Sequence, residues 1–293
     1  MNVELIFAAL GGLGAMLGWG ISDYFAKKSV DKVGHSVAIF WMQALGIIPL
    51  FIFFLFSLDI TNFKPSQILI VALLAIADAI GYLMFYKALE KGKVSIISPI
   101  TSSYAAFSVI ISAIFFHEYL SLKIILVLGL IFIGIVLASI SRGESKENNA
   151  KKEKWTKGVP EAIIGVILFS VLFPFWDRTV SNGNWLILLI LLRLFMSIFL
   201  FGANKIKRQR IKIENRSVIY WLLIIGLLDA IAYISLTWAY NATKYTSVIT
   251  MLSAIFSLPT LILARIFLKE RLGKIQIFGV TLILIGLACL GFI

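Results

Sequence analysis

Long apolar runs recur along the whole chain, and they constrain its fold more than any other feature. Only short polar segments separate them. A helix of about 20 apolar residues is long enough to cross the ~30 Å hydrocarbon core of a bilayer, and in lipid only helices and closed barrels satisfy their own backbone hydrogen bonds. We therefore predict an all-α integral membrane protein with ten transmembrane helices, at 5–26, 36–58, 67–89, 95–116, 121–141, 158–177, 184–204, 217–240, 246–267 and 274–293.

The composition agrees with this class of protein and argues against others. Of the 293 residues, 60% are hydrophobic and 14% are charged, far from the values of soluble domains. The formal net charge is +12, but the basic residues lie in short loops between apolar runs, so we expect a lipid bilayer and no nucleic acid as partner. The first apolar run, from Leu5 to about Phe25, is too long for a signal peptide and is expected to remain as a spanning helix.

A duplicated pattern divides the chain into two halves. Asp78-Ala-Ile-Gly-Tyr82 returns as Asp229-Ala-Ile-Ala-Tyr233, each time in the middle of an apolar run. A glutamate follows in both copies, 40 and 41 residues after the aspartate, at Glu118 and Glu270. The polar, charged segment between the copies is typical of a flexible linker. We predict a first five-helix repeat at 1–141, a linker at 142–157 and a second five-helix repeat at 158–293.

The basic residues indicate how the two repeats lie in the membrane. Because five is an odd number, the second repeat must enter from the side opposite to the first. Twenty-two Lys and Arg residues lie in the loops after odd-numbered helices, and four lie on the other face, at Lys64, Lys123, Arg178 and Lys244. The bias reverses between the repeats, as an inverted-topology repeat requires. The positive-inside rule then places the basic loops in the cytoplasm and both termini outside the cell membrane.

Motifs in both halves are similar to those of a known family. Tyr86-Lys-Ala-Leu-Glu-Lys-Gly-Lys-Val-Ser-Ile-Ile-Ser-Pro99 runs on to Phe116-His-Glu-Tyr-Leu-Ser121, and the second half holds Leu268-Lys-Glu-Arg-Leu-Gly273 and Gly279-Val-Thr-Leu-Ile-Leu-Ile-Gly286. These segments resemble the EamA family of the drug/metabolite transporter superfamily. The resemblance implies a ten-helix permease that moves a small metabolite by alternating access, powered by a gradient. Similar proteins are associated with amino acids, sugars, nucleotide sugars and toxic cations, and they are usually drawn with both termini in the cytoplasm.

Two central helices carry a carboxyl group and hydroxyl groups on one face. Asp78, Tyr82 and Tyr86 are spaced by four residues, as are Asp229 and Tyr233, so each set projects from one side of its helix. Intramembrane carboxylates are rare and usually face an interior path. We expect these residues to bind a cationic group of the solute or to carry a coupling proton. The alternative is that each aspartate only satisfies polar groups of a neighbouring helix.

Arg193 is a third charge deep in the predicted membrane region, and its counterpart in the first repeat is Gln43. Two alternatives stand open: Arg193 forms a salt bridge with Asp78 or Asp229, or it holds an anionic group of the solute, to which a guanidinium is well suited. If it pairs with one aspartate, we expect that aspartate to stay ionised and structural. The other would then exchange a proton or a cationic solute.

Helices four and nine are expected to line the same cavity. A proline frees the carbonyl one turn earlier and favours a kink, so Pro99 and Pro259 are predicted kink positions. Ser102 and Ser253 are predicted to face the solute, with packing by small residues as the alternative. Trp41 and Trp238 are predicted to form part of an aromatic wall against the solute, whereas the other tryptophans are expected in the interfacial belts.

The remaining polar and small residues are expected to have structural roles. Asp23 and Asp177 align as helix-end residues of the two repeats and are expected to cap or pair. Glycines on helices five and ten are expected to permit close packing, namely Gly129, Gly134, Gly279 and Gly286. His35 and His117 lie far apart with no cysteine at ligand spacing, so we predict no metal site and no cofactor.

The sequence contains no Walker A motif and no motif of a familiar hydrolase, so we do not expect an enzyme. The expected function is a secondary active transporter, with a small-molecule solute and protons as the coupling ion, acting as a monomer or homodimer. The alternatives are a multidrug or cationic-compound exporter and, less favoured, a membrane protein that does not transport.

Overall fold

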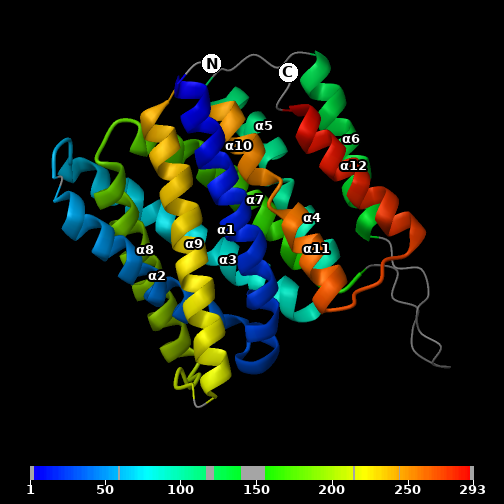
Figure 1. Ribbon diagram of the computed structural model, residues 1–293, viewed down its shortest axis with the longest axis horizontal. Coiled ribbons are helices and arrows are strands. Elements are labelled where there is room, and N and C mark those ends of the chain that lie inside the picture. Colours follow the sequence, from blue (N-terminus) through cyan, green and yellow to red (C-terminus); the bar gives the residue numbers. More distant parts are fainter. Residues whose placement is uncertain are drawn as a thin grey trace.

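The described part of the chain is a bundle of helices (Figure 1). The computed structural model describes residues 3–58, 60–116, 122–139, 156–213, 215–243 and 245–290, and no strand occurs among them. A short 3-10 turn at Pro65–Gln67 precedes α3. The helices are α1 Val3–Val33, α2 His35–Ser57, α3 Ile68–Lys91, α4 Val94–Ser102, α5 Tyr104–Phe116, α6 Leu122–Ser139, α7 Val159–Val180, α8 Trp185–Ile206, α9 Arg216–Ala242, α10 Thr246–Ala254, α11 Ser257–Phe267 and α12 Lys274–Leu290.

These helices correspond to the ten predicted spans. Eight helical segments are long and apolar enough to cross a membrane, and two of these, Val94–Phe116 and Val248–Phe267, each contain a break. The other two spans, α6 and α12, are shorter apolar helices. The predicted all-α membrane fold is therefore confirmed. His117, Glu118 and most of the predicted linker lie outside the described residues.

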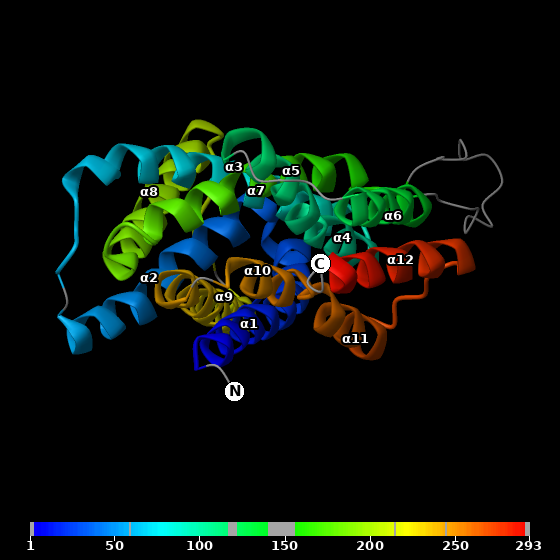
Figure 2. The ribbon, with the colours of Figure 1, turned by 90° about the horizontal axis from the view of Figure 1, so that it is seen from above.

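Helix contacts repeat with the two halves exchanged. The first helix of one repeat packs on the third helix of the other, α1 on α9 and α7 on α3. The second helices do the same, α2 on α9 and α8 on α3, while α6 packs on its own counterpart α12. Figure 2 shows α1 and α9 on one side of the molecule and α3 and α7 on the other. This pattern is that of inverted repeats related by a pseudo-two-fold axis.

Close approach of α1 to α9 depends on glycine. A Cβ atom at Gly11 would lie 2.2 Å from the Cβ of Ala239, and one at Gly18 would lie 2.6 Å from the carbonyl oxygen of Leu228. Both distances are shorter than any van der Waals contact. The hydrophobic effect does not drive helices together within lipid, so close packing of this kind stabilises the association of membrane helices.

Glu270 joins the second repeat to the first beside the basic loops after α3 and α11. Its carboxylate accepts hydrogen bonds from the backbone N–H of Val94 at 3.0 Å and of Ser95 at 2.9 Å, and from the Ser95 hydroxyl. These amides belong to the first turn of α4, where unpaired N–H groups favour a negative charge. The glutamate of the duplicated pattern thus caps a helix of the other repeat.

The pair α6 and α12, side by side at one edge in Figure 1, tests the predicted glycine contacts. A Cβ at Gly279 would lie 2.4 Å from the backbone nitrogen of Ala138 and 2.7 Å from the carbonyl oxygen of Gly134. A Cβ at Gly129 would meet nothing within 4 Å. The expectation for Gly129 is therefore wrong, because this residue lies on a side of α6 away from α12.

We predict that Gly279→Ala destabilises the protein, because the added methyl group would overlap with backbone atoms of α6, which have no alternative rotamer. Overpacking of this kind costs about 1–3 kcal/mol. The measurement is thermal unfolding of the purified protein in detergent. Gly129→Ala is the matched control and should keep the melting temperature of the parent. Equal melting temperatures for the two variants would contradict the packing of α6 on α12.

Candidate functional site

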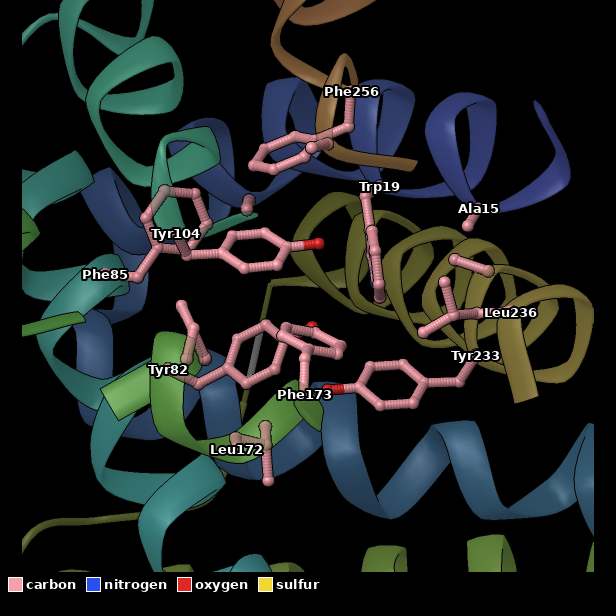
Figure 3. Close-up of a cluster of buried hydrophobic side chains, with 14 of the residues drawn as sticks. Ala15, Trp19, Tyr82, Phe85, Tyr104, Leu172, Phe173, Tyr233, Leu236 and Phe256 are labelled. Carbon is pink, nitrogen blue, oxygen red and sulfur yellow. The ribbon is translucent and has the colours of Figure 1, made fainter. Parts of the chain in front are cut away.

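A cavity lies between the two repeats in the middle of the bundle. The empty space in this region, counted together with the part that is open to solvent, is about 420 Å³. Figure 3 shows aromatic side chains from both halves converging here. The apolar wall consists of Trp19, Phe85, Phe169, Phe173 and Phe256, and the polar groups are those of Ser22, Asp23, Tyr82, Tyr86, Thr101, Tyr104 and Asp229.

The two duplicated Asp–Tyr pairs bond to each other across the repeat interface. Tyr82 on α3 donates a hydrogen bond to Oδ1 of Asp229 on α9 at 2.9 Å. Tyr233 on α9 donates to Oδ2 of Asp78 on α3, also at 2.9 Å. All four side chains are buried. Each aspartate therefore takes its tyrosine from the other repeat, and α3 and α9 are joined at matching positions.

Arg193 on α8 is fully buried, and its guanidinium has three neighbours. It forms a salt bridge with Oδ2 of Asp229 and donates a hydrogen bond to Oε1 of Gln43 on α2. Its Cζ atom lies 4.4 Å from the ring centroid of Tyr233, a cation–π contact. Arg193 is not among the residues that line the cavity. Its partner is thus Asp229, and its counterpart Gln43 is part of the same cluster.

Asp229 faces the cavity, but each of its oxygens is already bonded. Oδ1 accepts from Nε1 of Trp19 at 3.1 Å as well as from Tyr82. Oδ2 is held by Arg193. Asp78 differs: it does not line the cavity, its charge has no direct basic partner among the described residues, and its buried Oδ1 has no hydrogen-bond partner there. The two equivalent aspartates therefore have unequal surroundings.

Asp23 was missed as a site residue. The expectation that it ends a helix is wrong, because α1 continues to Val33, supported by the Lys27–Asp31 ion pair at 2.9 Å. Asp23 is buried, lines the cavity and accepts hydrogen bonds from Ser98 at 2.8 Å and Thr260 at 3.4 Å. Lys27 and Lys28, four and five residues after Asp23, are typical of the end of a spanning helix. The available signal was its position one turn from Trp19 on the same face of α1.

The counterpart of Asp23 in the second repeat has another environment. Asp177 on α7 is half-buried and accepts a hydrogen bond from Ser181, 3.3 Å away, near the end of its helix. It does not line the cavity. A role near a helix end fits Asp177 and does not fit Asp23.

Of the other predicted site residues, Tyr86 lines the cavity, whereas Ser102 and Ser253 do not. Ser102 is bonded to the carbonyl of Pro99 and lies 3.1 Å from the hydroxyl of Ser257, so it bridges α4 and α11. Ser253 donates to the carbonyl of Thr250 within its own helix.

The two predicted wall tryptophans lie elsewhere. Nε1 of Trp41 donates to the carbonyl of Ile211 in the loop after α8, at 2.8 Å. Trp238 packs against Phe7 with the ring centroids 5.3 Å apart. Neither lines the cavity, where the tryptophan is Trp19.

The broken spans lie close to the predicted prolines. Pro259 lies in the first turn of α11, just after the break between α10 and α11, whereas Pro99 lies four residues before the break at Ser103. At that break the hydroxyls of Ser102 and Ser103 bond to the carbonyls of Pro99 and Ile100 and compete with the backbone ladder.

Comparison with known proteins identifies the family to which this architecture belongs. The sequence profile of the EamA-like transporter family matches residues 6–140 and again 156–292, one match for each repeat. The chain belongs to the EamA-like transporter family. EamA-like proteins are membrane transporters of the drug/metabolite type, so the resemblance inferred from the motifs is confirmed.

Individual relatives agree with this assignment. An uncharacterized transporter of Archaeoglobus fulgidus is 22% identical over 95% of both chains. An uncharacterized protein of Methanocaldococcus jannaschii is 33% identical over 44% of this chain and 94% of its own length. One solved crystal structure superposes with a TM-score of 0.70 over 96% of this chain and 95% of its own, at 13% identity, which shows a shared fold.

We predict that Arg193→Leu strongly destabilises this EamA-like protein, because it leaves Asp229 buried without a counter-charge. Breaking a buried ion pair costs about 3–5 kcal/mol. Adding Asp229→Asn to Arg193→Leu should restore part of the loss, since no unpaired charge remains. The readout is thermal unfolding of the purified variants in detergent.

Asp78→Asn in the Arg193→Leu background is the matched control and should restore less, because Asp78 has no direct bond to Arg193. Strictly additive losses for Arg193→Leu and Asp229→Asn would contradict the pairing.

Proposed function

We propose that the chain is a secondary active transporter that carries a small organic solute by alternating access, with the central cavity as the solute site. The observation that carries this proposal is the buried cavity lined by polar and aromatic groups at the interface of two inverted repeats. Such interfaces are where transporters of this construction hold their substrates.

The broken spans supply positions at which access can alternate. The cavity residues Thr101 and Tyr104 flank the break at Ser103, and Phe256 lies at the break before α11. A change of backbone angles at these two breaks would move cavity walls without unfolding a helix. Glu270, which holds the first turn of α4 against the other repeat, would then close the end of the pathway next to the basic loops. We expect that end to face the cytoplasm.

We further propose that Asp78 carries the coupling proton. Arg193 is engaged by Asp229, so Asp78 is the member of the equivalent pair without a direct positive partner in the described structure. Its buried Oδ1 has no hydrogen-bond partner, and a proton on this oxygen would remove the uncompensated charge. The groups that face Asp78 are the hydroxyl of Tyr233 and, farther off, Arg193 and Asp229. Rearrangement of the crossed bonds would link protonation to the relative position of the repeats.

The experiment is transport into liposomes that contain the purified protein, with a panel of radiolabelled amino acids, sugars and amines and an imposed pH gradient. Asp78→Asn keeps the shape of the side chain and removes its charge. We predict that this variant loses gradient-driven accumulation while it still exchanges labelled for unlabelled solute. The exposed Asp31→Asn serves as the control and should accumulate like the parent. Accumulation by Asp78→Asn equal to the parent, with the same pH dependence, would reject this coupling role.

A further inference from the structure

We propose that the central cavity binds the ammonium group of a small organic amine and that Asp23 is its counter-ion. This inference rests on the proposed function in that it assigns the cavity to the solute. It goes further in naming the chemical class of the solute and the residue that selects it.

The first argument is the charge of the cavity wall. Among the described residues that line the cavity, the charged side chains are Asp23 and Asp229. Asp229 is compensated by Arg193 behind it. Asp23 has only hydroxyl donors, Ser98 and Thr260, and no basic side chain of the described chain forms an ion pair with it. A buried carboxylate of this kind is stabilised by a positive charge, and a cationic ligand can bring that charge into the cavity.

The second argument is the set of hydroxyl groups on the cavity wall. Thr101 is buried and lines the cavity, and its hydroxyl oxygen has no hydrogen-bond partner among the described residues. Ser22, the neighbour of Asp23 on α1, lines the cavity as well. An ammonium group carries N–H donors and no acceptor, so it matches a cavity wall that offers carboxylate and hydroxyl oxygens.

The third argument is the aromatic wall. Tyr86, Phe169, Phe173 and Phe256 line the cavity together with Trp19 (Figure 3 labels three of them). The faces of aromatic rings attract cations, most strongly for tryptophan and more strongly in a site without water. The same wall accepts the apolar body of an amine. An anionic solute would meet one uncompensated carboxylate, while the guanidinium of Arg193 is already occupied.

The test is calorimetric titration of the purified parent protein in detergent with three probes of similar size. Phenethylamine is cationic, 3-phenylpropanol is neutral and 3-phenylpropanoate is anionic. We predict that phenethylamine binds and that both other probes bind at least about tenfold more weakly. n-Butylamine and tetramethylammonium then separate the contribution of the aromatic body from that of the charge. If no amine binds, or if the neutral or anionic probe binds as tightly as phenethylamine, the proposal is overturned.

The matched variants are Asp23→Asn and Asp177→Asn. The two aspartates align between the repeats, but only Asp23 is among the residues that line the cavity. Asp23→Asn should weaken phenethylamine binding at least about tenfold, and Asp177→Asn should leave it unchanged. Asp23→Glu retains the charge and should restore part of the affinity. Should Asp23→Asn fail to fold, the charge series on the parent protein still decides, because it needs no substitution. Unchanged affinity in a folded Asp23→Asn protein would overturn the role of Asp23.

This binding test is separate from the transport test. Binding of amines that depends on Asp23, without any gradient-driven accumulation in liposomes, would support the inference and reject the proposed coupled transport. Accumulation of neutral or acidic solutes that is unaffected by Asp23→Asn would support transport and reject the inference.

Discussion

A guanidinium without access to water is the constraint on which the centre of this structure depends. Arg193 is 0% exposed, and a charge at such a place is tolerated only where protein groups replace its hydration. Asp229 supplies the opposite charge, Gln43 an amide oxygen and Tyr233 the face of a ring. Asp229 and Tyr233 lie on α9, and Gln43 lies on α2 of the other repeat, so the contacts of this one side chain on α8 join both repeats.

The same constraint makes two equivalent halves chemically unequal. A duplication places Asp78 and Asp229, and likewise Tyr82 and Tyr233, at matching positions. Arg193 has no arginine as its counterpart, because the matching position in the first repeat is Gln43. Asp229 therefore holds a salt bridge, while Asp78 has a tyrosine as its hydrogen-bond donor. An inverted repeat can thus keep a symmetric scaffold while its two carboxylates have unequal partners.

Much of this arrangement follows from the sequence. Apolar runs determine the spans because about 20 apolar residues are needed to cross the lipid, and the odd number of helices per repeat determines the inversion. The four-residue spacing of Asp78 and Tyr82 places both on one face. It does not reveal that each bonds to the other repeat, because that depends on how α3 and α9 cross in three dimensions.

Other features depend on packing that a single sequence does not contain. The first apolar run predicts a span that ends at residue 26, close to Asp23, but α1 continues to Val33, and Lys27 pairs with Asp31 in this extension. Trp41 lies near the start of its apolar run and Trp238 near the end of its run, and the two rings contact a loop and Phe7 rather than the cavity.

The crossed Asp–Tyr bonds between the repeats are the central claim, and double-mutant cycles on Asp78 test it most directly. Unfolding free energies of Asp78→Asn combined with Tyr233→Phe give the coupling across the interface, and those of Asp78→Asn combined with Tyr82→Phe give the coupling within α3. The structure predicts about 1 kcal/mol or more for the first pair and close to zero for the second. Coupling of Asp78 to Tyr82 in place of Tyr233 would show that each repeat satisfies its own carboxylate, and it would contradict this account.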